Sequence, residues 1–306
     1  MTISHFTAAD VPDQRGKTFF ITGANTGLGL ETTRVLAERG ARVLMGCRNR
    51  AKAEEALGGI EAEHPQADLT IVDIDLGDLA SIRSAAEVVA SEPHLDGLLN
   101  NAGVMVPPRQ LTKDGFESQF GVNHLGHFAL TGLLLPLLEE TRDSRVVTTS
   151  SNAHKMGSID FDDPHAEKRY SRLGRYGMSK LANLLFTYEL DRRLRQKGSD
   201  TIAVAVHPGG SDTELGRHLK GAFALLIPLL RPFLNSAPAG AWSTLMGATA
   251  PGVLGGQYFG PRSLGELTGP ARQVRSNAKS MDEGVARRLW DLSLELTDVN
   301  PGLPPT

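Results

Sequence analysis

The chain has 306 residues, of which 40% are hydrophobic and 22% charged, with a formal net charge of −3. These values are ordinary for a globular protein and exclude a basic nucleic-acid-binding surface or an acidic solvating tail. Cys47 is the only cysteine, which excludes an intrachain disulfide and fits a reducing compartment. We see no signal-peptide pattern and no run of ~18 apolar residues, so we expect a cytoplasmic protein without a transmembrane span.

Apolar, strand-like runs alternate with helical patterns along most of the chain. In chain order, strands are expected at 17–22, 41–46, 69–74, 95–100, 145–150, 201–206 and 256–260, and helices at Leu28–Glu38, Arg50–Glu63, Leu79–Ala90, Phe116–Leu138 and Tyr176–Gln196. Strands separated by helices of this length form βαβ units. The pattern predicts an α/β fold, with a doubly wound parallel sheet of about seven strands and helices on both faces.

The sequence contains no internal repeat and no linker, so we expect a single domain over residues 1–306. Its core would span about 15–260, and a C-terminal helix and tail would occupy 261–306. The chain ends NPGLPPT at 300–306, and we expect this proline-rich tail to fray.

A glycine-rich segment, TGANTGLG at 22–29, joins the first strand to the first helix. Gly23, Gly27 and Gly29 allow a tight turn and a close approach of a ligand to the backbone. The N-terminus of the following helix offers free N–H groups and a positive dipole end to a pyrophosphate. A tight structural turn is the alternative. The position between strand and helix favours a dinucleotide site and a Rossmann-type fold.

The wider spacing T-G-x-x-x-G-x-G resembles that of the short-chain dehydrogenase/reductase family, and further motifs of that family follow in order. They are NNAG (100–103), Asn123 in the next helix, Ser150-Ser151, YGMSK (176–180) and PGGSDT (208–213). The resemblance covers about residues 15–260. Stretches such as NNAGVM, GVNHLGHF, EKRYSR and SKLANLLFTYEL are most similar to the retinol-dehydrogenase-like branch, which acts on retinoids and other lipophilic carbonyls and alcohols.

The resemblance implies a set of residues around a nicotinamide dinucleotide. The catalytic residues would be Asn123, Ser151, Tyr176 and Lys180. The cofactor would contact Gly23, Asn25, Thr26, Gly27, Leu28, Gly29, Arg48, Asp75, Leu76, Asn101, Ala102, Gly103, Tyr176, Lys180, Pro208, Gly209 and Thr213.

The end of the second strand indicates NADP rather than NAD as the cofactor. An NAD-specific domain carries an acid there, ~20 residues after the glycines, but this chain reads GCRNRAK. Arg48 can place its guanidinium fork on a 2′-phosphate. The alternative is a solvated basic helix start. Asp75, after the third strand, resembles the family residue that meets the adenine, or it is a helix N-cap.

Tyr176 and Lys180 share one face at the start of a helix. A nearby ammonium, helped by the positive nicotinamide ring, can lower a phenol pKa of ~10 by ~1–3 units, into the range useful for proton transfer. Tyr176 would protonate the carbonyl oxygen, Lys180 would also hold the nicotinamide ribose, and Asn123 would hold a water that links Lys180 to solvent. Tyr170 lacks a lysine four residues on and is rejected.

Ser150 and Ser151 point to opposite faces of a strand, so only one can face the site. The family pattern favours Ser151, which would hydrogen-bond the carbonyl and stabilise its developing charge. The 25-residue separation of Ser151 from Tyr176 matches the retinol-dehydrogenase-like branch. The intervening segment, about Met156–Arg175, would form a loop beside the site.

Three further expectations concern metals, the substrate entrance and assembly. His124, His127 and His154 lack metal-ligand spacing, so we expect packing or loop roles and no metal. The apolar segment 221–234 would be a substrate lid, unless it packs on its own core or touches a membrane. The helix from Tyr176 is apolar around much of its circumference, which suggests a homo-oligomer, a dimer or tetramer, as in helix-mediated dimers of the family.

The sequence therefore predicts an oxidoreductase that transfers a hydride between NADP(H) and a carbonyl or alcohol of a small, lipophilic molecule. A C=C reductase related to the protochlorophyllide reductases is one alternative. A non-catalytic NADP-binding regulator is another, although Asn123, Ser151, Tyr176 and Lys180 are all present.

Overall fold

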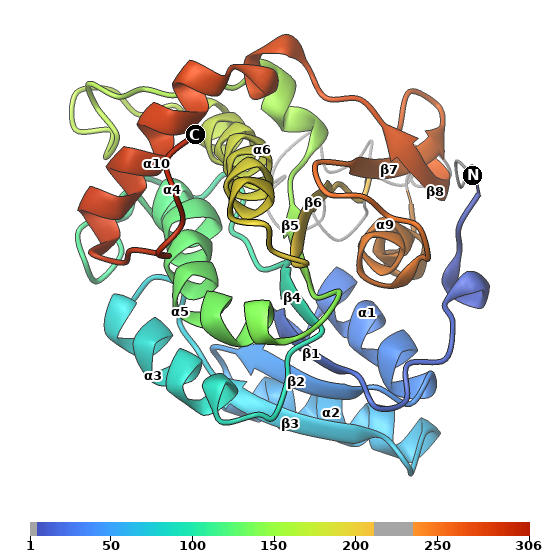
Figure 1. The fold of residues 1–306 in the computed structure, drawn as a ribbon. Coiled ribbons are helices and arrows are strands. Elements are labelled where there is room, and N and C mark those ends of the chain that lie inside the picture. The colour runs from blue at the N-terminus through green and yellow to red at the C-terminus, as the bar shows by residue number, and fades with distance from the viewer. Residues whose placement is uncertain (1–4, 211–234) are drawn as a thin grey trace.

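The computed structural model describes residues 5–210 and 235–306, and its frame is one eight-stranded sheet of order β3-β2-β1-β4-β5-β6-β7-β8. Strands β1 to β7 are parallel and β8 is antiparallel to β7 (Figure 1). The strands are β1 (Thr18–Thr22), β2 (Arg42–Cys47), β3 (Asp68–Asp73), β4 (Gly97–Asn100), β5 (Arg145–Thr149), β6 (Ile202–Val206), β7 (Tyr258–Ser263) and β8 (Thr268–Val274). The predicted α/β class is confirmed, with one strand more than expected.

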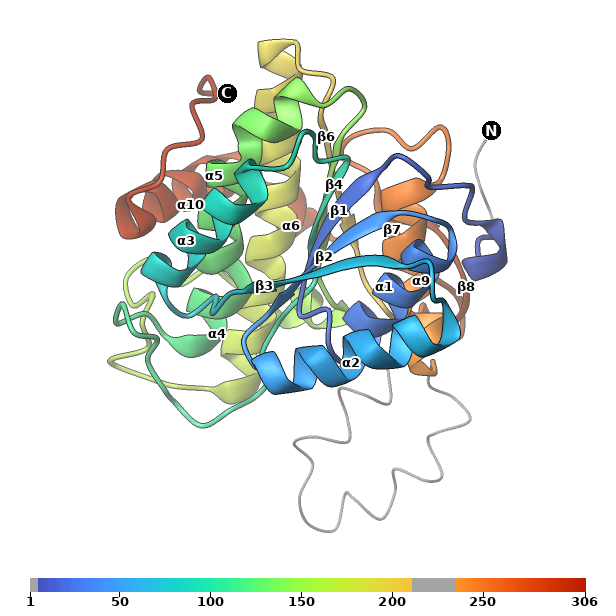
Figure 2. The same ribbon diagram turned by 90° about the horizontal axis from the view of Figure 1, so that it is seen from below.

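Helices cover both faces of the sheet (Figure 2). One face carries α1 (Gly27–Glu38), α2 (Arg50–Glu63) and α9 (Ala237–Thr249). The other carries α3 (Leu79–Ala90), α5 (Gly126–Glu140) and α6 (Arg172–Lys197), and α10 (Glu283–Thr297) lies outside them against α6. A short α4 (Ser118–Phe120) and a π-helical turn (Gly121–Leu125) lead into α5.

The central strands are buried on both faces, which explains their continuous apolar runs. All five residues of β1 are buried. Phe19 packs in the core beneath α1 and α9, whereas its neighbour Phe20 packs in the core beneath α3 and α5. Successive side chains of a strand point to opposite faces, so one strand contributes to both cores. Each buried Phe stabilises the fold by about 1.5–3 kcal/mol relative to an exposed one.

The strand order places the candidate site. From β1 the sheet is built outward in two directions, through β2 and β3 on one side and β4 to β8 on the other. At such a switch point the loops after the parallel strands separate and leave a crevice at the carboxyl edge of the sheet. The register aligns these carboxyl ends, since Thr22 of β1 pairs with Gly46 of β2 and Asn100 of β4 pairs with Thr148 of β5.

The C-terminal tail corrects an expectation, because it is held against the fold. Arg83 donates to the carbonyl of Asp298 at 3.1 Å. Arg193 reaches the carbonyl of Pro304 at 3.3 Å, and the Thr306 hydroxyl donates to the buried Glu189 carboxylate at 2.6 Å. The expected fraying is therefore wrong: Arg83 holds the chain just before the tail, and within the tail Pro304 and Thr306 bind Arg193 and Glu189 of α6.

The helix expected at Phe116–Leu138 is strongly apolar. Ser118–Glu140 is long and apolar enough to span a membrane by composition, but 78% of its most apolar stretch is buried inside the fold. It lies between α3 and α10 in the structure, and a core helix passes the same test.

The described chain stops at Gly210 and resumes at Asn235, whose backbone N–H donates to the Gly210 carbonyl at 2.7 Å. The expected lid at 221–234 and the candidate cofactor residue Thr213 lie outside the described residues.

Candidate active site

The glycine-rich turn has the geometry of a phosphate-binding turn. Gly23 and Gly27 adopt left-handed φ values of 68° and 55°, which favour glycine. A Cβ on Gly29 would collide with the Gly23 carbonyl, so only glycine lets α1 begin this close to β1. The Thr26 side chain makes no capping bond at the start of α1. Thr26 therefore does not occupy the first N–H groups of this helix, which can donate to a pyrophosphate.

The Asn101–Gly103 loop after β4 is tied to this turn through Thr22. The Thr22 hydroxyl accepts from the N–H groups of both Asn101 and Ala102 at 3.0 Å, and the Asn101 amide donates to the Thr22 carbonyl at 2.9 Å. A Cβ on Gly23 would lie 3.1 Å from that of Ala102. The two cofactor-binding segments predicted from sequence are thus packed against each other.

Arg48 and Asp75 stand at the ends of β2 and β3, where the adenosine half of a dinucleotide would lie. Their charged groups are 4.0 Å apart, and the Arg48 side chain is 71% exposed. The N-cap of α3 is Asp78, whose carboxylate accepts from the N–H groups of Ala80 and Ser81. Asp75 is therefore not that cap, although its carboxylate accepts from the N–H of Gly77. Leu76 is buried beside it.

Tyr176 and Lys180 lie on α6, as predicted. The Lys180 Nζ is 5.7 Å from the centre of the Tyr176 ring and donates to the Thr149 carbonyl, at the end of β5, at 3.1 Å. A Cβ on Gly103 would approach the Asn123 amide oxygen at 3.1 Å and the Lys180 Nζ at 3.6 Å. The structure thus brings the predicted ammonium, the Asn123 amide and the loop after β4 together.

Asn123 occupies a π-helical turn, which interrupts the expected regular helix there. Its amide oxygen accepts from the Val104 N–H at 2.7 Å, and its amide nitrogen donates to the Val104 carbonyl at 2.9 Å and the Ser179 hydroxyl at 3.0 Å. Such single-turn bulges are frequent at functional sites, because they re-aim one side chain. Here the turn aims Asn123 between the β4 loop and α6.

The two serines after β5 have different surroundings. The Ser150 hydroxyl donates to the Lys180 carbonyl at 2.8 Å and is fully buried against α6. Ser151 caps the 3₁₀-helix Asn152–Met156 by accepting from the Ala153 N–H at 3.2 Å, and its hydroxyl can still donate. This difference supports Ser151 over Ser150 as the residue that meets a substrate.

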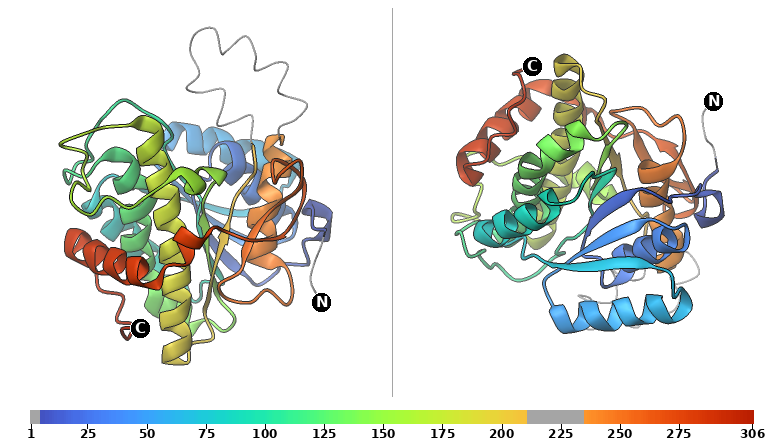
Figure 3. Two further views of the ribbon diagram at one scale, coloured as in Figure 1. Left: turned by 90° about the horizontal axis from the view of Figure 1, so that it is seen from above. Right: turned by 60° about the horizontal axis from the view of Figure 1, so that its bottom comes forward.

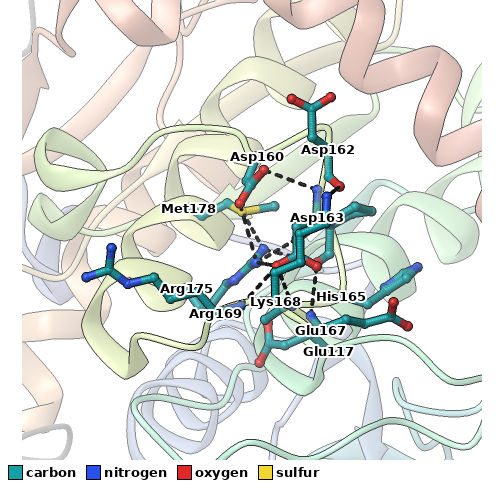
Figure 4. Close-up of polar contacts among 12 residues, drawn as sticks. Glu117, Asp160, Asp162, Asp163, His165, Glu167, Lys168, Arg169, Arg175 and Met178 are labelled. Atoms are coloured by element: carbon teal, nitrogen blue, oxygen red, sulfur yellow. Dashed lines mark hydrogen bonds and ion pairs between the residues drawn. The ribbon is translucent and has the colours of Figure 1, made fainter.

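The loop between the serines and Tyr176 is tightly anchored (Figure 4). Arg175 is buried, donates to the carbonyls of Asp163 and Pro164, and forms an ion pair with the Asp163 carboxylate at 3.6 Å. That carboxylate also accepts from the backbone N–H groups of residues 167–169. Burial alone would raise the pKa of Asp163, but these N–H bonds and Arg175 lower it. The loop therefore has a fixed shape beside the site.

This anchoring also corrects the expected start of α6. The helix begins at Arg172, capped by the Ser171 hydroxyl, which accepts from the Gly174 N–H at 3.2 Å. Tyr176 therefore lies in the second turn rather than at the first residue. The rejected Tyr170 fastens the loop instead, because its hydroxyl donates to the Pro107 carbonyl at 2.8 Å.

The Pro208–Gly209 turn follows β6 at the same edge of the sheet. Gly209 has a φ of 83°, and a Cβ on it would collide with the Leu267 carbonyl. The Asn235 amide donates to the Pro208 carbonyl at 3.0 Å. The turn therefore packs between Leu267, which precedes β8, and Asn235.

The three histidines near the motifs are buried in the fold. His124 stacks on Phe120, and burial lowers its pKa to about 3. Burial likewise lowers the pKa of His127 to about 4, and its ring joins Thr22 to the Asn123 carbonyl. The His154 Nδ1 lies 2.6 Å from the Ser151 carbonyl. His127 and His154 thus support site residues, a role that sequence spacing did not indicate.

The apolar circumference of α6 has an explanation within the chain. Figure 3 shows α10 beside α6, and there Phe186 stacks on Trp290 with ring centres 6.1 Å apart. The Arg193 guanidinium lies over the same Trp290 ring at 4.4 Å. The second covered face that suggested an oligomer is thus covered by α10. A dimer or tetramer stays a prediction without this support.

Comparison with known proteins places the chain in a family. Residues 17–222 match the family model of the short chain dehydrogenases. The match covers more than half of the chain, which therefore belongs to this family. The glycine-rich turn, NNAG and YGMSK had indicated the same family, and the prediction is confirmed.

Individual relatives point to one branch. The chain is 45% identical to human retinol dehydrogenase 14 over 303 residues, 91% of this chain and 85% of that protein. It is 46% identical to human retinol dehydrogenase 12 over 287 residues, 93% of this chain and 87% of that protein. These relatives confirm the resemblance to the retinol-dehydrogenase-like branch and support an oxidoreductase acting on alcohol or carbonyl groups.

Among solved structures, a putative uncharacterized protein from Mycobacterium paratuberculosis is similar with a TM-score of 0.80 at 41% identity, covering 97% of this chain and 98% of that one. A short chain dehydrogenase from Burkholderia cenocepacia in complex with NADP is 24% identical with a TM-score of 0.64, covering 80% of this chain and 96% of that one. The second likeness shows the fold alone.

Proposed function

We propose that this protein is an NADP(H)-dependent oxidoreductase that interconverts a lipophilic alcohol and its aldehyde or ketone. The observation that carries the proposal is the convergence of Tyr176, Lys180 and Asn123 beside the loop after β4, at the same sheet edge as the glycine-rich turn. Proton transfer to a carbonyl oxygen needs an acid, a means to tune its pKa and a donor for the developing charge. Tyr176, Lys180 and Ser151 fit these three roles.

The residues present fit a nicotinamide dinucleotide. Because Gly29 has no side chain, α1 begins directly against Gly23, which brings the first N–H groups of the helix to the turn where a pyrophosphate would bind. The tight approach of Gly103 to Asn123 and Lys180 brings the loop after β4 up to the predicted catalytic residues. Pro208 and Gly209 would flank the nicotinamide. When bound, the cofactor supplies the hydride in reduction and accepts it in oxidation.

The protein's own residues would manage the proton and the charge. In reduction, the Tyr176 hydroxyl donates its proton to the substrate oxygen while Ser151 donates a hydrogen bond to the same atom. The Lys180 ammonium lies close enough to the Tyr176 ring to stabilise the resulting phenolate. Asn123, fixed by Val104 and Ser179, holds the water through which Lys180 reaches solvent.

The preference for NADP rests on Arg48. Its largely exposed guanidinium stands at the end of β2, and the Asp75 carboxylate lies 4.0 Å from it. A guanidinium in that position binds a 2′-phosphate through two parallel hydrogen bonds. Arg50 is less suited, because it pairs with Asp73 at 3.1 Å and with Glu54 at 3.0 Å.

The lipophilic substrate class and the cellular place are further parts of the proposal. Similarity to proteins named retinol dehydrogenases supports a retinoid-like or other greasy substrate. We place the protein in the cytoplasm on the ground of its single cysteine, which is buried in β2.

A turnover assay tests the proposal. The wild-type protein with NADPH should reduce members of a panel of aliphatic aldehydes, retinal, steroids and quinones. Tyr176→Phe should lower turnover by ~10²-fold or more, the typical effect of losing a general acid, while NADPH binding is kept. Wild-type activity confined to conjugated C=C bonds would favour the C=C reductase instead. NADPH binding without turnover of any compound would favour a regulator.

A further inference from the structure

A buried histidine and a glutamate meet beside the candidate site, and the catalytic scheme uses neither. His207 is the residue after β6 and is fully buried. Its Nε2 lies 3.5 Å from a carboxylate oxygen of Glu266, which comes from the turn between β7 and β8. A carboxylate that is partly withdrawn from water needs hydrogen-bond or charge partners. The Glu266 oxygen faces the His207 ring at a distance longer than an ordinary hydrogen bond, and both of these atoms are buried.

The ring of His207 is held in one orientation. Its Nδ1 accepts from the Gly209 N–H at 3.3 Å, so Nδ1 carries no proton in this state and Nε2 carries the hydrogen that faces Glu266. The ring fills the space that a side chain on Gly260 would need, since a Cβ there would collide with Nε2. Burial lowers the pKa of His207 although Glu266 opposes the shift, so the ring is a neutral donor.

Glu266 reaches this position from a strained turn. Leu264, Gly265 and Glu266 all have left-handed φ values, 50°, 65° and 67°. Non-glycine residues rarely adopt this conformation, and it persists where the surroundings require it. Glycine adopts this conformation without strain, but Leu264 and Glu266, which flank Gly265, adopt it as well. The turn aims the Glu266 carboxylate inward.

Glu266 also contacts the segment that follows Ser151. Its carbonyl accepts from the Asn152 side-chain amide at 3.4 Å, and its carboxylate lies 3.7 Å from the Lys155 Nζ. Both partners belong to the 3₁₀-helix that Ser151 caps. Glu266 therefore joins the segment Ser151–Met156, here called the serine segment, to His207 and the Pro208–Gly209 turn that follows it.

The same hairpin turn supports the Pro208–Gly209 turn from a second side. The Leu267 carbonyl accepts from the Gly210 N–H at 3.1 Å, and Asn235 accepts from the Gly269 N–H at 3.1 Å while donating to Pro208. Backbone pairing of β5 with β6, in which the Ser150 N–H donates to the Val206 carbonyl at 2.7 Å, joins the two segments at the strand ends. Beyond the strand ends, the contact between His207 and Glu266 links the Pro208–Gly209 turn to the segment after Ser151 through side chains.

We propose that Glu266, acting through His207, is a positioning residue that sets the distance between the Pro208–Gly209 turn and Ser151. Under the proposed function, on which this inference rests, the first segment seats the nicotinamide and the second the substrate oxygen. The pair would thereby fix how close the hydride donor comes to the carbonyl carbon. A displacement of about 1 Å between reacting groups can cost ~10²-fold in rate.

The test compares four variants in steady-state kinetics with NADPH and with NADPH deuterated at the transferred position. Glu266→Ala removes the acceptor and should lower kcat by about tenfold or more and raise the deuterium isotope effect on kcat, because hydride transfer becomes slower than product release. Glu266→Gln keeps an acceptor for His207 and should stay close to wild type. Leu264→Ala alters the same left-handed turn away from His207 and should leave both quantities unchanged.

A histidine variant keeps the test decisive if Glu266→Ala does not fold. In His207→Asn, the amide oxygen can replace Nδ1 toward Gly209 but cannot reach Glu266, so the same loss of kcat is expected. Wild-type kcat and isotope effect in both Glu266→Ala and His207→Asn would overturn the proposal. So would an equal loss in Leu264→Ala, which would assign the effect to the turn and not to the carboxylate.

Measurements on the wild-type protein distinguish a failure of the proposed function from a failure of the proposed role of Glu266. Absence of turnover in wild type across the carbonyl panel would refute the proposed function. An active wild type whose variants match it would refute the Glu266 inference alone. Melting temperatures of all variants are measured alongside, because a purely structural role would lower them without a change in the isotope effect.

Discussion

The hydroxyl of Thr22 on β1 lies 2.9 Å from the imidazole Nε2 of His127 on α5. The other ring nitrogen of His127 faces the Asn123 carbonyl at 3.0 Å, so Nδ1 carries the hydrogen and Nε2 accepts from Thr22. The same hydroxyl accepts from the N–H groups of Asn101 and Ala102. Thr22 thus connects the glycine-rich turn, the loop after β4 and the π-helical turn that carries Asn123.

Thr22→Val should show what this connection contributes. Valine keeps the shape of threonine but leaves the Ala102 N–H and the His127 Nε2 without their buried partner, whereas the Asn101 N–H still donates to the Leu99 carbonyl at 2.9 Å. Each unsatisfied buried group costs about 1–3 kcal/mol, so urea unfolding should show a free energy of unfolding lower by at least that much. NADPH affinity should fall as well. Thr22→Ser retains the hydroxyl, and an equal effect of both variants would show that the methyl group matters instead.

Arg48→Ala should weaken NADPH binding and barely alter NADH binding. The lost interaction is charge-assisted and worth ~1.5–3 kcal/mol, which corresponds to tenfold to a hundredfold in Kd. Fluorescence titration of both cofactors measures the difference. Arg50→Ala is the matched control, because Arg50 is close in sequence but paired with Asp73 and Glu54. An equal loss for both cofactors in Arg48→Ala would make Arg48 a structural residue.

Arg175→Met should destabilise the fold through the loop before Tyr176. Removing the cation takes away the guanidinium that faces the Asp163 carboxylate and that donates to the carbonyls of Asp163 and Pro164, while the backbone N–H bonds to that carboxylate remain. Thermal and urea unfolding measure the loss. Arg175→Lys keeps the charge but not the planar fork that meets two carbonyls, so it should recover only part of the stability. Wild-type stability in Arg175→Met would mean that the backbone N–H groups alone suffice for Asp163.

Local signals in the sequence predicted the regular elements well. The structure places α2 at Arg50–Glu63 and α3 at Leu79–Ala90, the bounds expected. Asn49 and Asp78 cap these helices through their side chains, so the residue before each helix indicates where the helix begins. The glycine-rich turn was equally readable, because each glycine answers a local steric demand.

Other elements lacked a local signal. Strand β8 contains Gly269 and Pro270, which weaken a strand pattern but are tolerated at the edge of a sheet. The first turn of α6 is polar, and its apolar pattern becomes clear only beyond Tyr176. The π-helical turn at Asn123 depends on contacts with Val104 and Ser179 that come together only in the folded chain.

The residues that support the site could not be predicted from the sequence for the same reason. His127 meets Thr22 across 105 positions of the chain, and Glu266 is comparably distant in sequence from the segment after Ser151. Spacing motifs describe groups on one element, whereas these partners lie on strands and helices that only the sheet order brings together. The catalytic assignments themselves stay predictions until the variants are measured.

Two buried histidines give the fold a pH dependence. Burial lowers the pKa of His127 to about 4 and that of His124 to about 3. In the unfolded chain both rings have a pKa of about 6.5. Between these values the unfolded state binds protons that the folded state does not. The stabilising effect is therefore complete above pH of about 6.5 and is lost as the pH falls toward the folded pKa values.

Unfolding in urea at pH 7 and pH 5 should accordingly show a loss of stability on acidification, of which each of these histidines accounts for about 2 kcal/mol. His124→Leu removes one of the two rings while its stacking neighbour Phe120 keeps an apolar contact. Ser293, which lies 2.9 Å from the His124 ring, still donates to the Leu289 carbonyl, so the variant should fold. Its loss of stability between pH 7 and pH 5 should be smaller than that of wild type by about 2 kcal/mol. An unchanged difference between the two pH values would mean that His124 is protonated within the fold, and that the pH dependence originates in other groups.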